Sequence, residues 1–287
     1  MNASIQLPVI KIKETSQSSS QDILAVEEPL EIRLAYNFQG LYKNQNLAVT
    51  MRTPGNDAEL ALGFIFTEGI INNYADVESV GYVFETCSEN KQNVIKIILR
   101  ENAIPNLSQA ERNFYTTSSC GVCGKASISA IRTISFFSKR IADDKKIDAN
   151  FFFGLPDILS AQQKIFADTG GLHAAALFNQ QGEILVLRED VGRHNALDKL
   201  IGTSLMENKL PLDNCILLLS GRASFELVQK AAMAGISIIA AVGAPSSLAV
   251  SLAEEFGITL VGFLKNNRFN IYSADHRIKV PSYENTY

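Results

Sequence analysis

The sequence predicts an α/β fold, in which a three-layer domain with a mixed sheet follows a smaller α+β roll of ββαββ order. Between Leu172 and Tyr272, the pattern of strand, glycine-bearing loop and helix occurs three times. The later strands are continuous apolar runs, which are typical of strands covered on both faces. Nearer the N-terminus, strand-like runs surround a single helical run, which indicates one helix lying across a small sheet.

Residues 1–24 are expected to form an N-terminal strand and a polar loop. Val9–Lys13 alternates apolar and charged side chains, which is a short strand signal. Ser16–Asp22 is rich in Ser and Gln and indicates a loop. The ordered fold is therefore expected to begin near residue 25.

The small roll is expected over residues 25–112. A break at Pro54-Gly55-Asn56-Asp57 supplies a cap for a helix over Ala58–Ile65. Strand patterns lie on both sides of this helix, at Leu30–Tyr36, Asn46–Thr53, Val77–Glu85 and Val94–Arg100.

The larger domain is expected over residues 113–287. Its strand and helix units are Ile184–Leu187 with Asn195–Ile201, Ile216–Leu219 with Phe225–Ala234, and Ile236–Val242 with Ser246–Phe256. A last strand over Ile258–Leu264 turns at Asn266-Asn267 into Phe269–Tyr272. These units predict a three-layer domain with a mixed sheet.

The composition excludes several classes of protein. Of the 287 residues, 46% are hydrophobic, which is enough to build a core and rules out a wholly disordered chain. The 26 Lys and Arg against 30 Asp and Glu give a net charge of −4, which argues against broad nucleic-acid binding. Any anionic ligand must therefore be held by a local group of donors.

The cysteines and the hydropathy pattern predict a cytoplasmic protein. The chain has four Cys, only two of them close together, which does not match a disulfide scaffold. Neither a signal-peptide pattern nor an apolar run of membrane-spanning length is present, so no membrane association is expected. Thiols are kept reduced in the cytoplasm, so a Cys-x-x-Cys pair there indicates chemistry or metal binding.

That pair is Cys120 and Cys123, which precede a helical stretch rich in Ala, Ser and Ile. A cysteine at a helix N-terminus is stabilised as the thiolate by exposed amides and the helix dipole, and Lys125 adds a positive charge. Gly121 and Gly124 suit a mobile loop.

Three interpretations of the pair stay open. A structural zinc site needs about four ligands, whereas the chain has one pair and three scattered His, so no metal site is predicted. A dithiol redox pair would normally lie in a thioredoxin-type βαβ unit, which is missing here. A nucleophilic thiolate that carries sulfur as a persulfide needs only the lowered pKa and the loop.

A second candidate region follows the strand Ile184–Leu187 and surrounds Gly192. Its six ionisable side chains are Arg188, Glu189, Asp190, Arg193, His194 and Asp198. The carboxyl ends of strands are where open α/β sheets bind ligands. The alternative is a solvated turn with internal pairs such as Arg193–Asp190. His194 is a candidate proton carrier because the ordinary pKa of histidine is near neutrality.

Two loops between strands and helices form a third region. Their candidate residues are Ser220, Gly221, Arg222, Ala244, Pro245 and Ser246. Adjacent helix N-termini present free amides to an anion, and Arg222 can pair with a phosphate. Plain helix capping, by Ser224 and Ser246, is the alternative.

Two further segments add candidates. Gly170-Gly171 permits close backbone approach, and His173 either faces a ligand or is buried and hydrogen-bonded. The final hairpin either clamps a nucleotide or only solubilises the chain, and its candidates are Phe263, Leu264, Lys265, Asn266, Asn267 and Arg268. Cys87 and Cys215 are interpreted as background thiols.

Together these motifs resemble the FdhD-type formate dehydrogenase accessory sulfurtransferase family. The segments that carry the resemblance are 118–125, 170–173, 188–199, 220–222 and 262–268, with Thr53-Pro54-Gly55 and Leu60–Ile71 in the N-terminal half. The similarity spans roughly Ala25 to Tyr272.

The resemblance implies a protein that accepts sulfur from a cysteine desulfurase as a cysteine persulfide. It then passes the sulfur to the molybdenum cofactor, in the bis(guanine dinucleotide) form, before the cofactor enters formate dehydrogenase. By the same resemblance, Cys120 carries the persulfide, Cys123 is its partner and Phe263–Arg268 binds the cofactor, which GDP can mimic. Lys265 stands where the family is expected to have Arg more often.

The resemblance also implies a homodimer and a large domain similar to the cytidine deaminase fold. Base deamination is not expected, because the only Cys pair precedes His173 and no His-x-Glu triplet is present. Two alternatives stay open: a non-catalytic chaperone that only binds the cofactor, and a redox or metal protein that uses the Cys-x-x-Cys pair.

Overall fold

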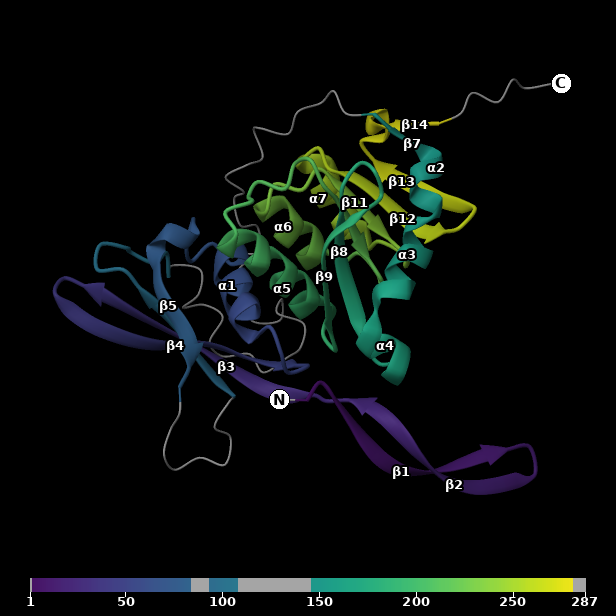
Figure 1. Ribbon diagram of the computed structural model, residues 1–287. Helices are drawn as coiled ribbons and strands as arrows, with labels where there is room; N and C mark the ends of the chain where they lie inside the picture. The colour runs from purple at the N-terminus through teal and green to yellow at the C-terminus, as the bar shows by residue number, and fades with distance from the viewer. Residues whose placement is uncertain (1, 84–92, 108–145, 281–287) are drawn as a thin grey trace.

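The computed structural model describes residues 2–83, 93–107 and 146–280, which form a hairpin and two units built on sheets (Figure 1). The elements before residue 108 are β1 (Ser4–Lys13), β2 (Ser16–Ala25), β3 (Glu28–Phe38), β4 (Leu41–Arg52), α1 (Asp57–Thr67), η1 (Tyr74–Asp76), β5 (Val77–Tyr82) and β6 (Val94–Leu99).

The elements after residue 145 make up the larger unit. They are β7 (Ile147–Asp148), α2 (Ala149–Phe153), α3 (Leu155–Gln162), α4 (Lys164–Thr169), β8 (His173–Phe178), β9 (Ile184–Asp190), α5 (Arg193–Met206), β10 (Ile216–Leu219), α6 (Phe225–Met233), β11 (Ile238–Ala241), α7 (Ser247–Glu255), β12 (Thr259–Lys265), β13 (Arg268–Ser273), η4 (Asp275–Arg277) and β14 (Ile278–Lys279).

The small unit has the predicted ββαββ order. Its four strands lie in the order β4-β3-β6-β5, with β3 and β6 parallel and the other pairs antiparallel. Leu30, Ile32 and Leu34 alternate along β3, so their side chains share one face and join the core that contains Leu60 and Phe66 of α1.

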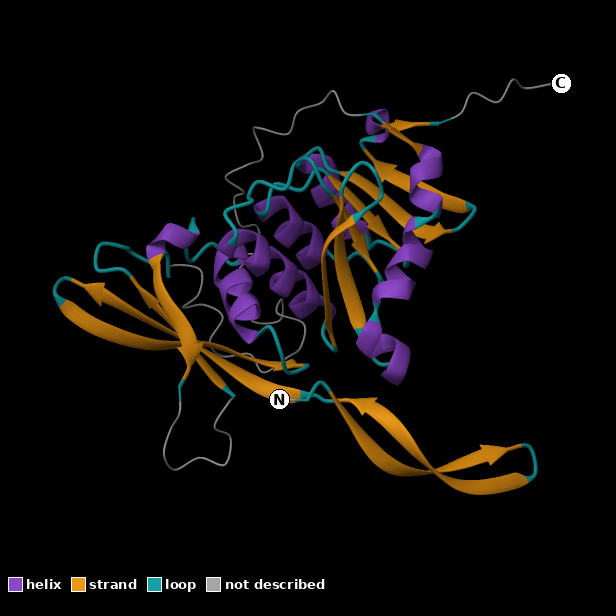
Figure 2. Cartoon of the chain, in the orientation of Figure 1, coloured by secondary structure: helices purple, strands orange, loops and turns teal. Residues whose placement is uncertain are grey.

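The larger unit has the three layers expected from its apolar strands (Figure 2). The six strands lie in the order β13-β12-β11-β10-β8-β9, and only the β10–β11 and β11–β12 pairs are parallel. Ala175 and Leu177 of β8 belong to the core shared with α5, α6 and α7. Ala176 and Phe178 belong to a second core, which includes Phe152 of α2. The mixed sheet is therefore buried on both faces.

The two units share one apolar core, because α1 packs directly on α5. A Cβ atom at Gly63 would lie 1.9 Å from the carbonyl oxygen of Asp198, and one at Gly202 would lie 1.9 Å from that of Glu59. Both glycines therefore allow the helix backbones to touch. Below this crossing, Lys230 of α6 donates to Asp198 and to Thr67 Oγ1, which links three helices.

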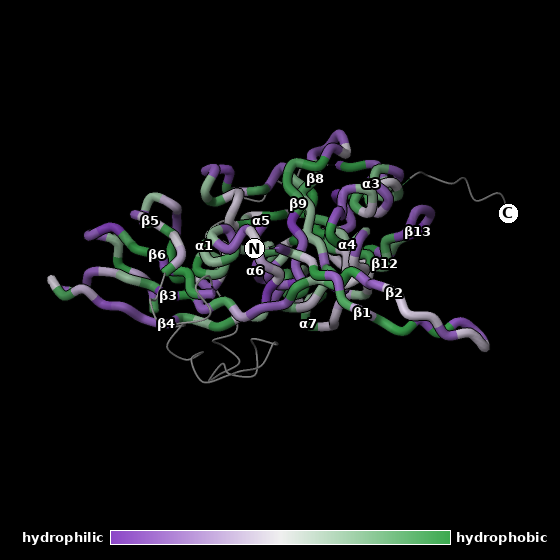
Figure 3. Tube along the Cα trace, turned by 60° about the horizontal axis from the view of Figure 1, so that its bottom comes forward, coloured by the Kyte–Doolittle hydropathy of each residue, from purple (hydrophilic) through white to green (hydrophobic). Residues whose placement is uncertain are grey.

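The prediction of a polar loop at Ser16–Asp22 was wrong. These residues form most of β2, which pairs with β1 in antiparallel register from Ser4–Ala25 to Lys13–Ser16. Backbone bonds to the apolar partner strand hold this segment, so its own side chains need no apolar alternation. The hairpin extends away from the body, and Figure 3 shows green apolar stretches along β1, although no hairpin residue is buried.

The short helices α2, α3 and α4 were not predicted from the sequence. They cover one face of the six-stranded sheet and form its third layer with their few buried residues, such as Phe152, Leu155 and Leu159. Within the described ranges, no helix is long and apolar enough to cross a membrane.

Candidate functional site

The candidate site lies at the edge where the parallel strands β10, β11 and β12 end. Since β8 is antiparallel to β10 and β9 is antiparallel to β8, β8 begins at this edge and β9 ends there. His173, Asp190, Ser220, Gly243 and Phe263 therefore come together from five separate strands or their following loops. The predicted residues therefore lie at the carboxyl edge of the sheet, where open α/β sheets bind ligands.

Backbone hydrogen bonds join the three loops at this edge. Gly243 N donates to Gly221 O at 2.9 Å, Ser246 N donates to Ala223 O at 3.0 Å, and Phe263 N donates to Gly243 O at 3.0 Å. A Cβ atom at Gly243 would lie 3.0 Å from Arg222 Cγ, so the lack of a side chain permits this packing. The loops form one connected surface.

His173 lies directly against the Ser220-Gly221 backbone. Ser220 Oγ accepts a hydrogen bond from Ala174 N at 2.8 Å, which ties the loop to the start of β8. A Cβ atom at Gly221 would lie only 3.2 Å from His173 Nδ1. Burial, and next to it the charge of Arg193, lowers the pKa of His173. His173 is therefore a neutral, half-buried imidazole at neutral pH.

Asp190 organises the turn that precedes α5. Its Oδ1 accepts from Gly192 N at 2.8 Å and from Asn195 Nδ2 at 3.1 Å. Its Oδ2 accepts from Thr53 N and lies 2.7 Å from Lys199 Nζ. The possible Arg193–Asp190 pair is therefore absent, because Lys199 from the next turn of α5 occupies that carboxylate.

The six ionisable side chains of this region do not act as one group. Arg188 pairs with Glu59 of α1, and the Glu189 carboxylate accepts from the amides of α4. Asp198 is buried beneath them with Lys230. His194 lies against Glu226, and Arg193 makes no salt bridge with any described residue.

His194 does not fit the role of a proton carrier near neutral pH. Burial, together with the charges of Lys230 and Arg193, lowers its pKa to about 3. Its Nε2 lies 3.2 Å from Ser224 Oγ and 3.1 Å from Glu226 Oε2. A nucleophilic triad needs the serine and the acid on different ring nitrogens, so this trio is not one.

The two helix starts differ in how their serines are used. Ser246 caps α7 by accepting a hydrogen bond from Ala249 N at 3.2 Å, as the sequence predicted. Ser224 occupies the corresponding position before α6 but makes no capping bond, because its hydroxyl contacts His194. The amides at the start of α6 are therefore left without a side-chain cap.

The predicted cofactor stretch is only partly at the site. The side chain of Leu264 is fully buried in the core with Phe152 and does not face the loops at the sheet edge. The turn at Asn266-Asn267 is confirmed, and Asn266 Nδ2 donates to Asp157 of α3 at 2.7 Å. Lys265 and Arg268 are exposed and are backbone partners on either side of the turn, at the tip of the β12–β13 hairpin and beyond the joined loops.

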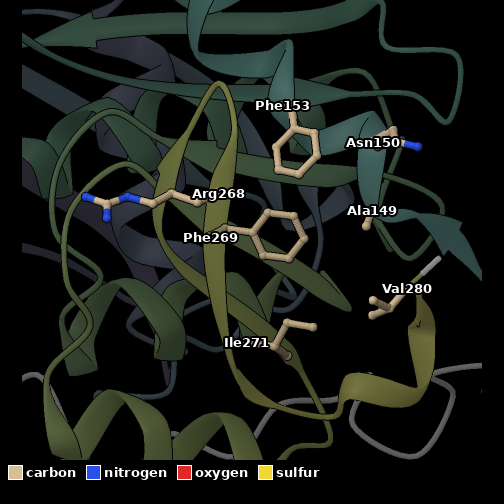
Figure 4. A pocket seen from close by; sticks show the side chains of 7 residues that line it. All are labelled: Ala149, Asn150, Phe153, Arg268, Phe269, Ile271 and Val280. Carbon is tan, nitrogen blue, oxygen red and sulfur yellow. The ribbon is translucent and has the colours of Figure 1, made fainter. Parts of the chain in front are cut away.

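Two cavities lie on the two sides of β13. One, of about 260 Å³, is lined by Phe263, Arg268 and Asn270. The other, of about 340 Å³, is mostly apolar and is lined by Ala149, Asn150, Phe153, Arg268, Phe269, Ile271 and Val280 (Figure 4). In this view Arg268 points away from the rings of Phe153 and Phe269, so its guanidinium belongs to the first cavity.

The predicted sulfur-carrying pair, Cys120 and Cys123, lies outside the described residues, as does Cys87. Cys215 is partly buried before β10 and packs against the main core. Within the described ranges, no group of three or more His, Cys, Asp or Glu side chains is arranged to hold a metal ion.

Comparison with known proteins decides the family. The model of the FdhD/NarQ family matches residues 25–279. The chain belongs to the FdhD/NarQ family. Its hairpin β1–β2 lies almost entirely before the matched residues, whereas every loop of the candidate site lies within them.

Relatives within this family are similar along nearly their whole length. The sulfur carrier protein FdhD of Mycolicibacterium paratuberculosis is 53% identical over 90% of this chain and 92% of its own. That of Streptomyces avermitilis is 47% identical over 94% of both chains. That of Sulfurisphaera tokodaii is 43% identical over 95% of this chain and 98% of its own.

A solved structure has the same fold. It is described as a formate dehydrogenase accessory protein from Desulfotalea psychrophila, and it aligns with a TM-score of 0.70 over 97% of this chain and all of its own. The two sequences are 22% identical, so this likeness concerns the fold alone.

Proposed function

We propose that this FdhD/NarQ family member is a sulfur carrier required for formate dehydrogenase activity. The observation that carries the proposal is the similarity to proteins named as sulfur carriers, which reaches 53% identity over nine-tenths of the chain. The matched region includes the Cys120-Gly-Val-Cys123 segment and all of the joined loops at the sheet edge.

Sulfur enters at Cys120 in this proposal. The Cys120 thiolate attacks the outer sulfur of a cysteine desulfurase persulfide, a new S–S bond forms, and the desulfurase cysteine leaves as a thiolate. Cys120 is then the persulfide. In the sequence, Cys120 precedes a stretch predicted to be helical and lies five residues before Lys125, which supports it as the thiolate that attacks.

The acceptor of the sulfur is the molybdenum cofactor in its bis(guanine dinucleotide) form, which is substrate here. It docks by its phosphates at the joined loops, with Arg222, Pro245 and Ser246 at the helix starts and Arg268 beside Phe263. Uncapped amides before α6 and an exposed Arg222 guanidinium support an anion there. GDP serves as a soluble mimic of one half of the cofactor.

Release of the sulfur involves Cys123. Its thiolate attacks the inner sulfur of the Cys120 persulfide, a Cys120–Cys123 disulfide forms, and hydrosulfide leaves for the cofactor. We further propose that the protein acts as a cytoplasmic homodimer between the desulfurase and formate dehydrogenase. Its six-stranded sheet, covered on both faces, supports the expected likeness of the large domain to the cytidine deaminase fold.

Persulfide labelling after incubation with a cysteine desulfurase and cysteine tests the proposal. We expect Cys120→Ala to lose the label and Cys215→Ala, a matched control in the core, to retain it. Full labelling of Cys120→Ala would overturn the assignment. If cells that produce only a Cys120→Ala/Cys123→Ala variant still have active formate dehydrogenase, the protein is instead a chaperone that binds the cofactor without carrying sulfur.

A further inference from the structure

The hairpin of β1 and β2 projects from the body as a two-stranded sheet, which no other described strand extends (Figure 1). None of its residues is buried. Its large apolar side chains that are at least 40% exposed are Ile5, Leu7, Ile10, Ile12 and Leu24. A hairpin of two strands alone is marginally stable in water, whereas three or more strands with an apolar face are stable. The hairpin is therefore suited to pair with a further strand.

The outer edge of β1 is closed to such a strand by Pro8. The ladder between the two strands is continuous across the Pro8–Gln21 pair. Pro8 has no N–H, and the main-chain groups of successive residues point alternately to the two edges of a strand, so the Pro8 nitrogen points away from β2. A strand added beside β1 would meet the proline ring there, and Lys11 and Lys13 further along. Proline and lysine are residues with which natural proteins block free edges.

The outer edge of β2 is open. Its ten residues contain no proline, no bulge interrupts their pairing, and Asp22 is their only charged side chain. Asp22 lies 4.0 Å from Lys11 of the neighbouring strand, so its charge is offset within the hairpin. By the same alternation, the outward main-chain groups of β2 include those of Gln17, Ser19 and Gln21. A long edge without blocking residues is a site for strand pairing.

We propose that the outer edge of β2 pairs with the same edge of a second copy of this chain, in antiparallel orientation. An antiparallel pair of identical strands has a two-fold axis, so one open edge per chain closes a dimer instead of extending a fibre. The hairpin carries two cations, Lys11 and Lys13, and two anions, Glu14 and Asp22, so two hairpins do not repel each other. The product is a four-stranded sheet of order β1-β2-β2-β1.

The antiparallel orientation also gives the exposed apolar side chains a partner. It brings the tip of one hairpin, which carries Ile10 and Ile12, to the base of the other. At that base Ala25 lies beside Gly171, shortly after α4, and Phe166 of α4 is 38% exposed. The interface therefore combines main-chain pairing with an apolar contact, as stable protein interfaces do.

The proposal deepens the proposed function by locating the contact of the homodimer. It rests on that function only for the expectation that two copies associate, because the edges of the hairpin carry the rest. The sulfur chemistry of Cys120 plays no part in it.

Sedimentation equilibrium of the full chain over a range of concentrations tests the contact. The natural chain should pass from the monomer mass of 31.4 kDa to twice that mass as its concentration rises. Ser19→Pro removes one outward N–H from each copy and no hydrogen bond to β1, and it should weaken the dimer by about tenfold or more. Gln6→Pro is the matched control, because it places a proline on the outer edge of β1, which Pro8 already blocks. It should dimerise like the natural chain.

A second variant and a melting experiment separate pairing from folding. Ile10→Ser/Ile12→Ser leaves the main-chain edge of β2 unchanged but removes the apolar tip, and it should also weaken the dimer. At a concentration at which every protein is monomeric, all three variants should melt within about 4 °C of the natural chain, because the hairpin contributes no buried residue to the core.

The outcomes distinguish this proposal from the proposed function. Dimerisation of Ser19→Pro with the strength of the natural chain would overturn the β2 contact and leave a homodimer through another surface. A natural chain that is monomeric at every concentration would overturn both the homodimer and its contact. Loss of persulfide labelling at Cys120 in a natural chain that still dimerises through β2 would contradict the sulfur carrier alone.

Discussion

Burial keeps the folded His194 uncharged, so the stability of the protein should fall as the pH falls below 6.5. In the unfolded chain a histidine takes up a proton near pH 6.5, whereas the folded His194 does so only near its pKa of about 3. Between these values the unfolded state binds the additional proton, so the free energy of unfolding falls as pH falls, by at most about 1.4 kcal/mol per pH unit. Above pH 6.5 His194 is neutral in both states, so it adds nothing to the change of stability with pH.

The charged groups around His194 are Lys230, Arg193 and Glu226, and the titratable group beside them is the partly buried His173. Their own titrations are common to both proteins when the natural chain is compared with His194→Gln. We expect urea unfolding from pH 7 to pH 4.5 to show a shallower decline in stability for the variant. Parallel curves would show that His194 is accessible to protons in the fold.

The sequence placed His173, Arg193 and His194 at the correct edge because each follows or begins an apolar strand. It could not assign their partners, since a salt bridge depends on which helix face meets which turn. Lys199, from the second turn of α5, reaches back to Asp190 at the end of β9. Ser224 stands at the sequence position of a helix cap, but its hydroxyl contacts His194, which is 30 residues away in the sequence.

At the level of the helices, the α1–α5 contact depends on glycine. We expect Gly63→Ala to destabilise the fold by about 3 kcal/mol, because its methyl group would meet the Asp198 backbone, which cannot rotate away. Gly154→Ala is the control, since it has open space and a right-handed φ of −81°. Denaturant unfolding measures both, and a loss shared equally by the two variants would contradict the close-packing explanation.

The helices and strands with a clear apolar pattern were predicted from the sequence. Elements that depend on pairing or packing with another segment were not. The strands β10 and β11 and the helices α1, α6 and α7 lie within one or two residues of their expected positions. In contrast, β2 has no apolar alternation over Ser16–Asp22 and is a strand only because β1 pairs with it. The helices α2 to α4 are short and bury few residues, so their periodicity was too weak to detect.

For the whole molecule, the sequence pattern changes near residue 113, where a domain boundary was predicted. The main apolar core, however, contains residues from both sides of that boundary. The apolar side chains of β3, α1, α5 and α6 form one continuous cluster. Lys230, Asp198 and Thr67 bind one another across it. The small roll therefore supports the helix α5 that carries Arg193 and His194, which a reading of local pattern alone could not reveal.

The hairpin β1–β2 stands outside that shared core, and this leads to a prediction for its removal. None of its residues is buried, its closest helix is α4, and the family match begins only at residue 25. It exposes large apolar side chains, including Ile10 at 63% and Ile12 at 67%. Deleting residues 2–24 should therefore change the melting temperature by less than about 4 °C, because it removes no core contact.

The same deletion leaves the joined loops at the sheet edge in place, since these loops follow β10, β11 and β12. It should also reduce self-association in size-exclusion chromatography, since exposed apolar side chains promote it. A fall in the melting temperature of more than about 10 °C would correspond to several kcal/mol. The hairpin would then be an integral part of the fold, which contradicts the burial pattern of its two strands.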